Sequence, residues 1–110
     1  MHDTTKASIV NALSEMASEI APHVYLRPMY GGLVIELEKG DPKSRIGGFF
    51  AYSEHVSLEF SMGAHLIDLN GVLEGSGKLR RHVKLYVVGD INNKDCSSLL
   101  DQAIARAGFG

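Results

Sequence analysis

The residues best suited to chemistry lie in one stretch, 71–87, which reads GVLEGSGKLRRHVKLYV. Its three glycines indicate a loop of unusual backbone shape, because glycine tolerates positive φ and lets a ligand or another backbone approach closely. The basic residues that follow predict a strand carrying cations. A loop and strand of this kind can contact a phosphate or a carboxylate. The candidate anion-binding residues are Gly75, Gly77, Lys78, Arg80, His82 and Lys84.

The spacing of the cations supports this hypothesis without excluding a structural one. On a strand, Arg80, His82 and Lys84 share one face at intervals of roughly 7 Å, so two or three can reach one anion. The segment differs from a phosphate-binding P-loop, since Val72 replaces the first glycine and Leu79 replaces the Ser or Thr that would bind magnesium. The structural alternative is a turn followed by a strand whose long cations cover apolar surface.

The other titratable residues follow no spacing typical of a catalytic or metal centre. The chain has no His-x-x-x-His or Cys-x-x-Cys pair, and no strand–turn–helix elbow presents a nucleophile. We therefore expect no cofactor and no catalytic residue. The single cysteine, Cys96, is interpreted as a packing residue, although a nearby helix start would lower its pKa. Glu15 and Glu19, an i, i+4 pair, are the alternative metal-binding residues, weighed against a solvated helix face.

Length and composition predict one small globular domain, residues 1–110. The chain is 45% hydrophobic and 22% charged, which is ordinary for a folded domain. A net charge of -2 provides no overall positive field, so nucleic acid is not an expected partner. No window approaches the roughly 18 apolar residues of a membrane span. With one cysteine and no signal-peptide pattern, we expect a cytoplasmic location. The oligomeric state stays open, a homodimer included.

Hydrophobic periodicity predicts a helix at each end of the chain. Residues 5–21 carry an apolar stripe at helical spacing, with a cap from Asp3, Thr4 or Thr5 and an end at Ala21 before Pro22. Residues 93–107 form the second helix, capped by Asn92 or Asn93. Its expected buried stripe is Leu99, Leu100, Ala103, Ile104 and Ala107.

Between the helices the pattern changes to that of strands. Residues 23–29, 33–38, 46–52, 55–62 and 80–88 are the expected strands, and Pro28 places the first at a sheet edge. The third and fourth form a hairpin. Residues 63–78 are expected to be a long loop with one helical turn. In the last strand, Arg81 shares the inward face with Val83, Leu85 and Val87.

Together these elements predict an α+β fold: a curved antiparallel sheet with the N- and C-terminal helices packed on one face, in two layers. The other face is expected to be open and to carry Glu36, Glu38, His55, Ser57, Glu59, Arg80, His82 and Lys84. The expected core is Ile9, Leu13, Met16, Ile20, Leu58, Phe60, Val83, Leu85, Leu100 and Ile104.

The segment HVSLEFSMGAHLIDLNGVLEGSGKLRRHVKL, residues 55–85, resembles the signature of the YdhG-like family of domains of unknown function (series number 1801). The resembling motifs are Tyr30-Gly31-Gly32, residues 55–60, Gly63-Ala64, residues 73–78 and residues 81–84, and they cover essentially the whole chain. The resemblance implies a compact α+β domain and no settled activity. Some members are labelled iron chaperones because their fold is loosely frataxin-like, but helix one here lacks the dense acidic ridge of frataxins.

Two function classes follow from these observations, with an enzyme third. The first is a small cytoplasmic binding domain that holds a small anionic ligand, or an acidic segment of a protein partner, at the glycine-rich loop and basic strand. The second, implied by the resemblance, is a frataxin-like iron carrier.

Overall fold

The computed structural model describes residues 2–108 and has the α+β architecture that the sequence predicts. Five strands form one antiparallel sheet in the order β1-β2-β3-β4-β5, so that each strand pairs with its neighbour in sequence. The strands are β1 Tyr25–Met29, β2 Gly32–Glu36, β3 Arg45–Ala51, β4 Val56–Phe60 and β5 Arg81–Leu85. The helices are α1 Asp3–Ile20, α2 Gly89–Asn93 and α3 Cys96–Gly108, with short 3-10 turns η1 Pro42–Ser44 and η2 Gly63–His65.

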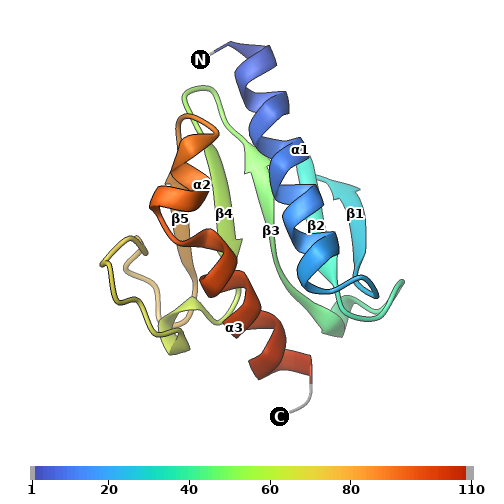
Figure 1. Ribbon diagram of the computed structural model, residues 1–110. Helices are drawn as coiled ribbons and strands as arrows, with labels where there is room; N and C mark the ends of the chain where they lie inside the picture. The colour runs from blue at the N-terminus through green and yellow to red at the C-terminus, as the bar shows by residue number, and fades with distance from the viewer. Residues whose placement is uncertain (1, 109–110) are drawn as a thin grey trace.

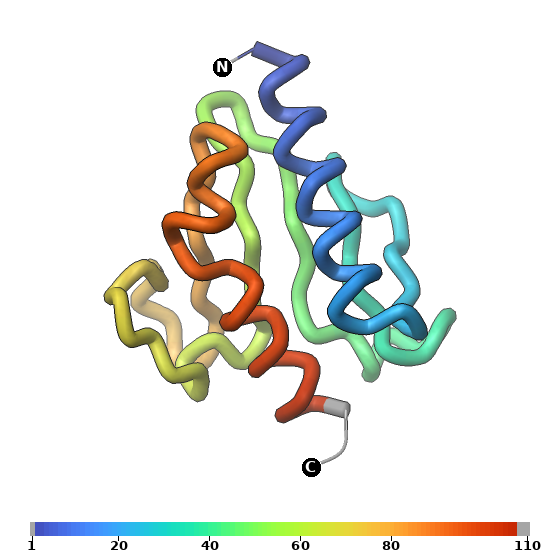
Figure 2. Tube along the Cα trace, viewed as in Figure 1, coloured from blue at the N-terminus to red at the C-terminus, as the bar shows by residue number. Residues whose placement is uncertain are grey.

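All three α-helices lie on the same side of the curved sheet, which leaves the opposite face open (Figure 1). The segment between η2 and β5 lies at the β5 edge of the sheet (Figure 2), and its Ile67 exchanges two hydrogen bonds with the Gln102 side chain of α3. The antiparallel meander explains this arrangement, since strands that are joined by short turns leave the terminal helices to cover one face. No helix within residues 2–108 combines the length and the apolar character needed to cross a bilayer.

The core lies between the helices and the sheet. Seven of the expected core residues are fully or almost fully buried: Ile9, Leu13, Leu58, Phe60, Val83, Leu85 and Leu100. Met16, Ile20 and Ile104 are only partly buried and pack at its margin. Phe49 is fully buried but was not predicted to be a core residue, because residues 46–52 are apolar on both faces and show no alternation.

The start of α1 differs from the prediction. The residue before the helix is His2, which makes no side-chain capping hydrogen bond, and Asp3 already lies in the first turn. The carboxylate of Asp3 is still favourable there because it faces the positive end of the helix dipole. The end of the helix at Ala21 is as predicted.

The C-terminal region contains two helices instead of the single predicted one. β5 ends at Leu85 because the Asp90 carboxylate accepts the N–H groups of Tyr86 at 2.8 Å and Val87 at 3.3 Å, which turns the chain out of the sheet. Asp95, with φ of 57°, then separates α2 from α3. Asn92 and Asn93 therefore belong to α2 and do not cap the long helix.

Two residues that were predicted to face the core, Ala107 and Val87, are exposed. Ala107 is exposed near the end of α3, whereas Leu99 and Ala103 are buried as predicted. Val87 is 54% exposed because it follows the end of β5 and does not continue the inward face of that strand.

The core assignment is testable by truncation. Leu58→Ala and Leu85→Ala are each expected to lower the free energy of unfolding by about 2 to 5 kcal/mol, through lost apolar contacts and an unfilled cavity. Leu69→Ala is the matched control, since Leu69 is 88% exposed and its loss should change stability little. Urea denaturation measures all three variants. Equal stability of Leu58→Ala and Leu69→Ala would show that the core has been assigned wrongly.

Candidate functional site

The face of the sheet away from the helices carries the polar residues of interest. The strand register places Arg27, Val34, Gly48, Glu59 and His82 in one row across all five strands. Gly48 adds no side chain to this row, and the Phe50 ring and the Leu33 carbonyl lie too close to Gly48 to leave room for one. This alignment brings residues from both halves of the chain to one surface.

Four of the six predicted anion-binding residues line one cavity of about 220 Å³ on this face: Gly75, Gly77, Arg80 and His82. Arg81 and Glu59 complete its wall. Arg80 lies just before β5 and is exposed, which leaves its guanidinium accessible to a ligand. The structure thus brings the glycine loop and the first cations of the strand together.

Two predicted members, Lys78 and Lys84, do not line this cavity. Lys78 is exposed in the loop. Lys84 Nζ lies 3.8 Å from Glu74 Oε1, so this lysine makes an ion pair with the loop. At half exposure such a pair stabilises the protein by only about 0 to 1 kcal/mol.

Backbone and side-chain hydrogen bonds hold the loop against β5. The Asp68 carboxylate accepts the N–H groups of Val72 at 3.0 Å and Leu73 at 2.9 Å. Glu74 and His82 then exchange two backbone hydrogen bonds of 2.7 and 2.9 Å. Gly75 has φ of 128°, a conformation that L side chains rarely adopt. The loop is therefore a defined element.

Arg81 differs most from its expected role. The strand register places it opposite Phe60, on the inward face with Val83 as predicted, but its Nη1 donates 2.6 Å hydrogen bonds to the carbonyls of Gly77 and Arg80. It lies at the end of β5, where the long side chain can turn back toward the loop. Its guanidinium is thus fixed beside the cavity before any ligand arrives.

Glu59 gives the cavity one negative group. Its Oε2 accepts the hydroxyl of Tyr52 at 2.9 Å, and this hydrogen bond raises the pKa of Tyr52. The cavity wall combines the guanidinium groups of Arg80 and Arg81 with this single carboxylate, so its balance of permanent charge is positive.

A second cavity, of about 410 Å³, adjoins the first and shares Arg80 and Glu59 with it. Three aromatic residues, Tyr30, Phe50 and Tyr52, line this cavity. Its other lining residues are Val34, Arg45, Gly47, Gly48 and Ser61. This cavity was not predicted from the sequence, where the Gly47-Gly48 pair inside an apolar strand is the local signal for it.

Tyr30 stands in this cavity wall because of a strained turn. Tyr30 and Gly31 have φ of 55° and 74°, and they form the two-residue connection between β1 and β2. Positive φ at both positions is typical of a type I′ hairpin, in which Asn or Gly usually occupies the first. A tyrosine at this position is strained, and strain of this kind is concentrated at functional sites.

Two residues expected on the open surface, Ser57 and Glu36, are buried. Ser57 lies on the same face of β4 as Glu59, and His55 comes just before the strand. The Tyr52 ring stacks on His55, with ring centroids 5.1 Å apart, and its hydroxyl donates to Glu59, so Tyr52 contacts the residues on both sides of Ser57. Within residues 2–108, the buried Ser57 hydroxyl has no hydrogen-bond partner.

Glu36 is buried because two arginines and one backbone amide surround its carboxylate. Oε2 accepts from Arg27 Nε at 2.8 Å and Arg45 Nε at 2.9 Å, and Oε1 accepts from the Gly40 N–H at 2.9 Å. The hydrogen bond from Arg27, followed by that from Gly40, lowers the pKa of Glu36 to about 2. This network fixes Arg45, which lines the second cavity.

His55 occupies the hairpin end of the open face, between two tyrosine rings. Its ring centroid lies 5.1 Å from that of Tyr52 and 6.0 Å from that of Tyr86. Burial lowers the pKa of His55, and the nearby Lys84 and His82 lower it further. The remaining expected member, Glu38, is exposed beyond the end of β2.

The alternative metal-binding residues lie elsewhere. Glu15 and Glu19 are both exposed on α1. Within the part of the chain that the structure describes, no three His, Cys, Asp or Glu residues group closely enough to hold a metal ion. Cys96 is fully buried, and burial raises the pKa of its thiol to about 12, opposite to the lowering that a helix start would cause.

Comparison with known proteins does not assign the chain to a family. No family model matches the chain, and searches of curated proteins and of solved structures find no match. The resemblance to the YdhG-like family therefore remains a prediction from the sequence motifs.

The Glu36 network predicts a specific acid sensitivity. The pKa of Glu36 in the folded protein, about 2, is below its ordinary value of 4.5. Its contribution to stability is therefore complete above about pH 4.5 and is lost as the pH falls toward 2. In Glu36→Gln, the melting temperature should be lower at pH 7 and should depend less on pH across this window.

Glu38→Gln is the matched control, because Glu38 is exposed and two residues away. Circular dichroism melting curves at several pH values measure the effect. A Glu36→Gln profile that runs parallel to that of the unmodified protein would contradict the role assigned to this carboxylate.

Proposed function

We propose that this protein is a small binding domain that holds an anionic ligand on the open face of its sheet. The observation that carries the proposal is the cavity formed by the glycine loop, Arg80, Arg81 and His82. Four of the anion-binding residues predicted from the sequence line this concave surface: Gly75, Gly77, Arg80 and His82. Concave sites with a few convergent polar groups are the usual form of ligand sites.

The anionic group of the ligand lies between the two guanidinium groups in this proposal. Arginine presents several N–H donors in one plane and can bind phosphate or carboxylate through paired hydrogen bonds. Arg81 is already held by the carbonyls of Gly77 and Arg80. A donor that is fixed in advance loses less entropy when the ligand binds.

The rest of the ligand occupies the adjoining aromatic cavity. Arg80 and Glu59 belong to both cavities, so one molecule can extend from one to the other across them. Tyr30, Phe50 and Tyr52 favour a flat ring in the second cavity. Glu59 favours an N–H or O–H donor on that ring. The ligand class that fits is a ring compound bearing a phosphate or carboxylate, of about the size of a mononucleotide.

A cytoplasmic location suits this proposal. Cys96 is a buried, free thiol, as is common in a reducing compartment, where disulfides are rare.

Thermal shift and calorimetry with phosphate, citrate and adenosine monophosphate test the proposal. A bound anion stabilises the folded state by mass action, so millimolar ligand should raise the melting temperature. Arg80→Ala should weaken binding roughly ten- to hundred-fold, which is the scale of one lost hydrogen bond to a charged group. His82→Ala should weaken it less.

Lys78→Ala is the matched control, because it removes one positive charge from the same loop without touching the cavity. It should bind the anions as the unmodified protein does. Equal weakening by Lys78→Ala and Arg80→Ala would indicate a general charge effect, and the proposal would fail. The absence of any response to all three anions would also contradict it.

A further inference from the structure

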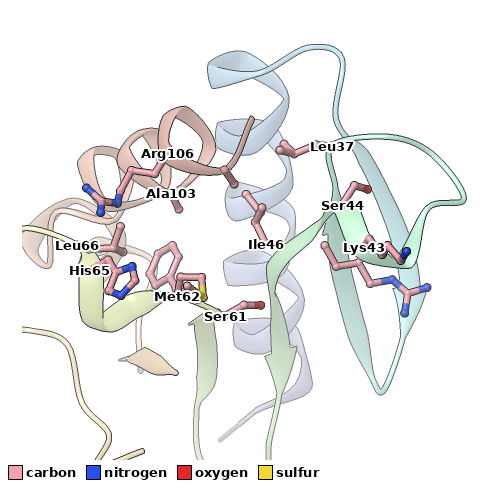
Figure 3. Close-up of a pocket in the computed structure, with 13 residues that line it drawn as sticks. Leu37, Lys43, Ser44, Ile46, Ser61, Met62, His65, Leu66, Ala103 and Arg106 are labelled. Atoms are coloured by element: carbon pink, nitrogen blue, oxygen red, sulfur yellow. The ribbon is translucent and has the colours of Figure 1, made fainter. Parts of the chain in front are cut away.

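A larger cavity, of about 660 Å³, lies on the helix side of the sheet (Figure 3). It is lined by the C-terminal half of α3, by η1 and η2, and by the adjacent ends of β3 and β4. It shares Arg45 and Ser61 with the aromatic cavity of the open face. Neither the glycine loop nor Arg80 lines it, so it is separate from the proposed anion site.

The floor of this cavity is apolar and continuous with the core. Ile46 and Phe60 belong to the main hydrophobic cluster and are 8% and 1% exposed. The other apolar lining residues are Leu37, Met62, Leu66, Ala103 and Ala107. Met62 is 48% exposed at the margin, and its flexible side chain can adapt to the shape of an apolar ligand.

The rim of the cavity is basic. Figure 3 shows Arg106 and His65 on one side and Lys43 on the other. Arg45 also lines it but already donates to Glu36. None of the lining residues is an aspartate or a glutamate. Within residues 2–108, neither Lys43 nor Arg106 makes an ion pair with a carboxylate.

We propose that this cavity binds an amphiphilic carboxylate, of which a single-chain fatty acid is the simplest form. The apolar chain lies on Ile46, Phe60 and Leu66, and the carboxylate lies at the rim near Lys43 or Arg106. Charge complementarity selects this occupant: an apolar floor alone would accept a neutral molecule, whereas cations above it favour one with a negative head group. The cavity volume is within the range of small-molecule sites.

Calorimetry and amide NMR with decanoate and dodecanoate below their micelle concentrations test this proposal. Dodecanoate should bind saturably and shift the amides of Met62, His65 and Leu66. Each added methylene should strengthen binding by roughly fourfold, the value expected for buried hydrocarbon. Dodecanol should bind at least tenfold more weakly than dodecanoate.

Charge and volume variants locate the site. Lys43→Glu and Arg106→Glu, both at exposed positions, should each weaken dodecanoate binding at least fivefold. Ala107→Phe should weaken it by occupying part of the cavity. Lys78→Glu is the matched control, because it changes the net charge equally but lies outside the cavity, and it should bind dodecanoate normally. Arg80→Ala should also bind it normally, which separates this site from the proposed anion site.

Several results would overturn the proposal. One is unchanged dodecanoate binding in both Lys43→Glu and Arg106→Glu. Another is equal weakening in Lys78→Glu. A signal that begins only where dodecanoate forms micelles would show that the protein binds an amphiphile surface instead of enclosing one molecule. Equal affinity for dodecanol and dodecanoate would show that the rim cations do not favour a negatively charged head group.

Discussion

The carboxylate of Glu36 is held by groups from three separate segments of the chain, and much of the structure depends on it. Arg27 comes from β1, Gly40 from the turn after β2, and Arg45 from the start of β3. The register between β2 and β3 shifts beside Glu36, so this ionic contact secures the sheet at its irregular point. A buried carboxylate without these partners would be strongly destabilising. The same contact orients Arg45, which lines cavities on both sides of the sheet.

The fold could be predicted from the sequence because its signals are local. The apolar stripe of α1, the alternation in β4 and the position of Pro28 in an edge strand each depend on neighbouring residues. Hydrophobic alternation did not predict which residues are buried where both faces of a strand are covered. Phe49 and Phe50 are both buried, so β3 shows no alternation, and period two does not reveal that Ser57 is buried on the open face. The early end of β5 depends on the carboxylate of Asp90, which a hydrophobic pattern ignores.

The candidate site was predictable in part for the same reason. Gly75, Gly77, Arg80 and His82 lie close in sequence, so their spacing was enough to bring them together. Glu59 and the aromatic wall come from distant segments, and only the strand register places them beside the loop. Lys84 was assigned to the correct face but forms an ion pair with Glu74. The guanidinium of Arg81 turns toward the loop, against the direction that strand alternation predicts.

The proposed function depends on one feature, the proposed anion site between Arg80, Arg81 and His82. Arginine side-chain and backbone amide NMR during a titration with adenosine monophosphate measures this most directly, because it reports the location of the ligand. The account predicts saturable shifts of the Arg80 Nε–H group and of the Gly75, Gly77 and His82 amides, while the amides of Glu15 and Glu19 on α1 stay unchanged. Saturable shifts confined to other parts of the molecule, or no shift at these groups, would contradict it.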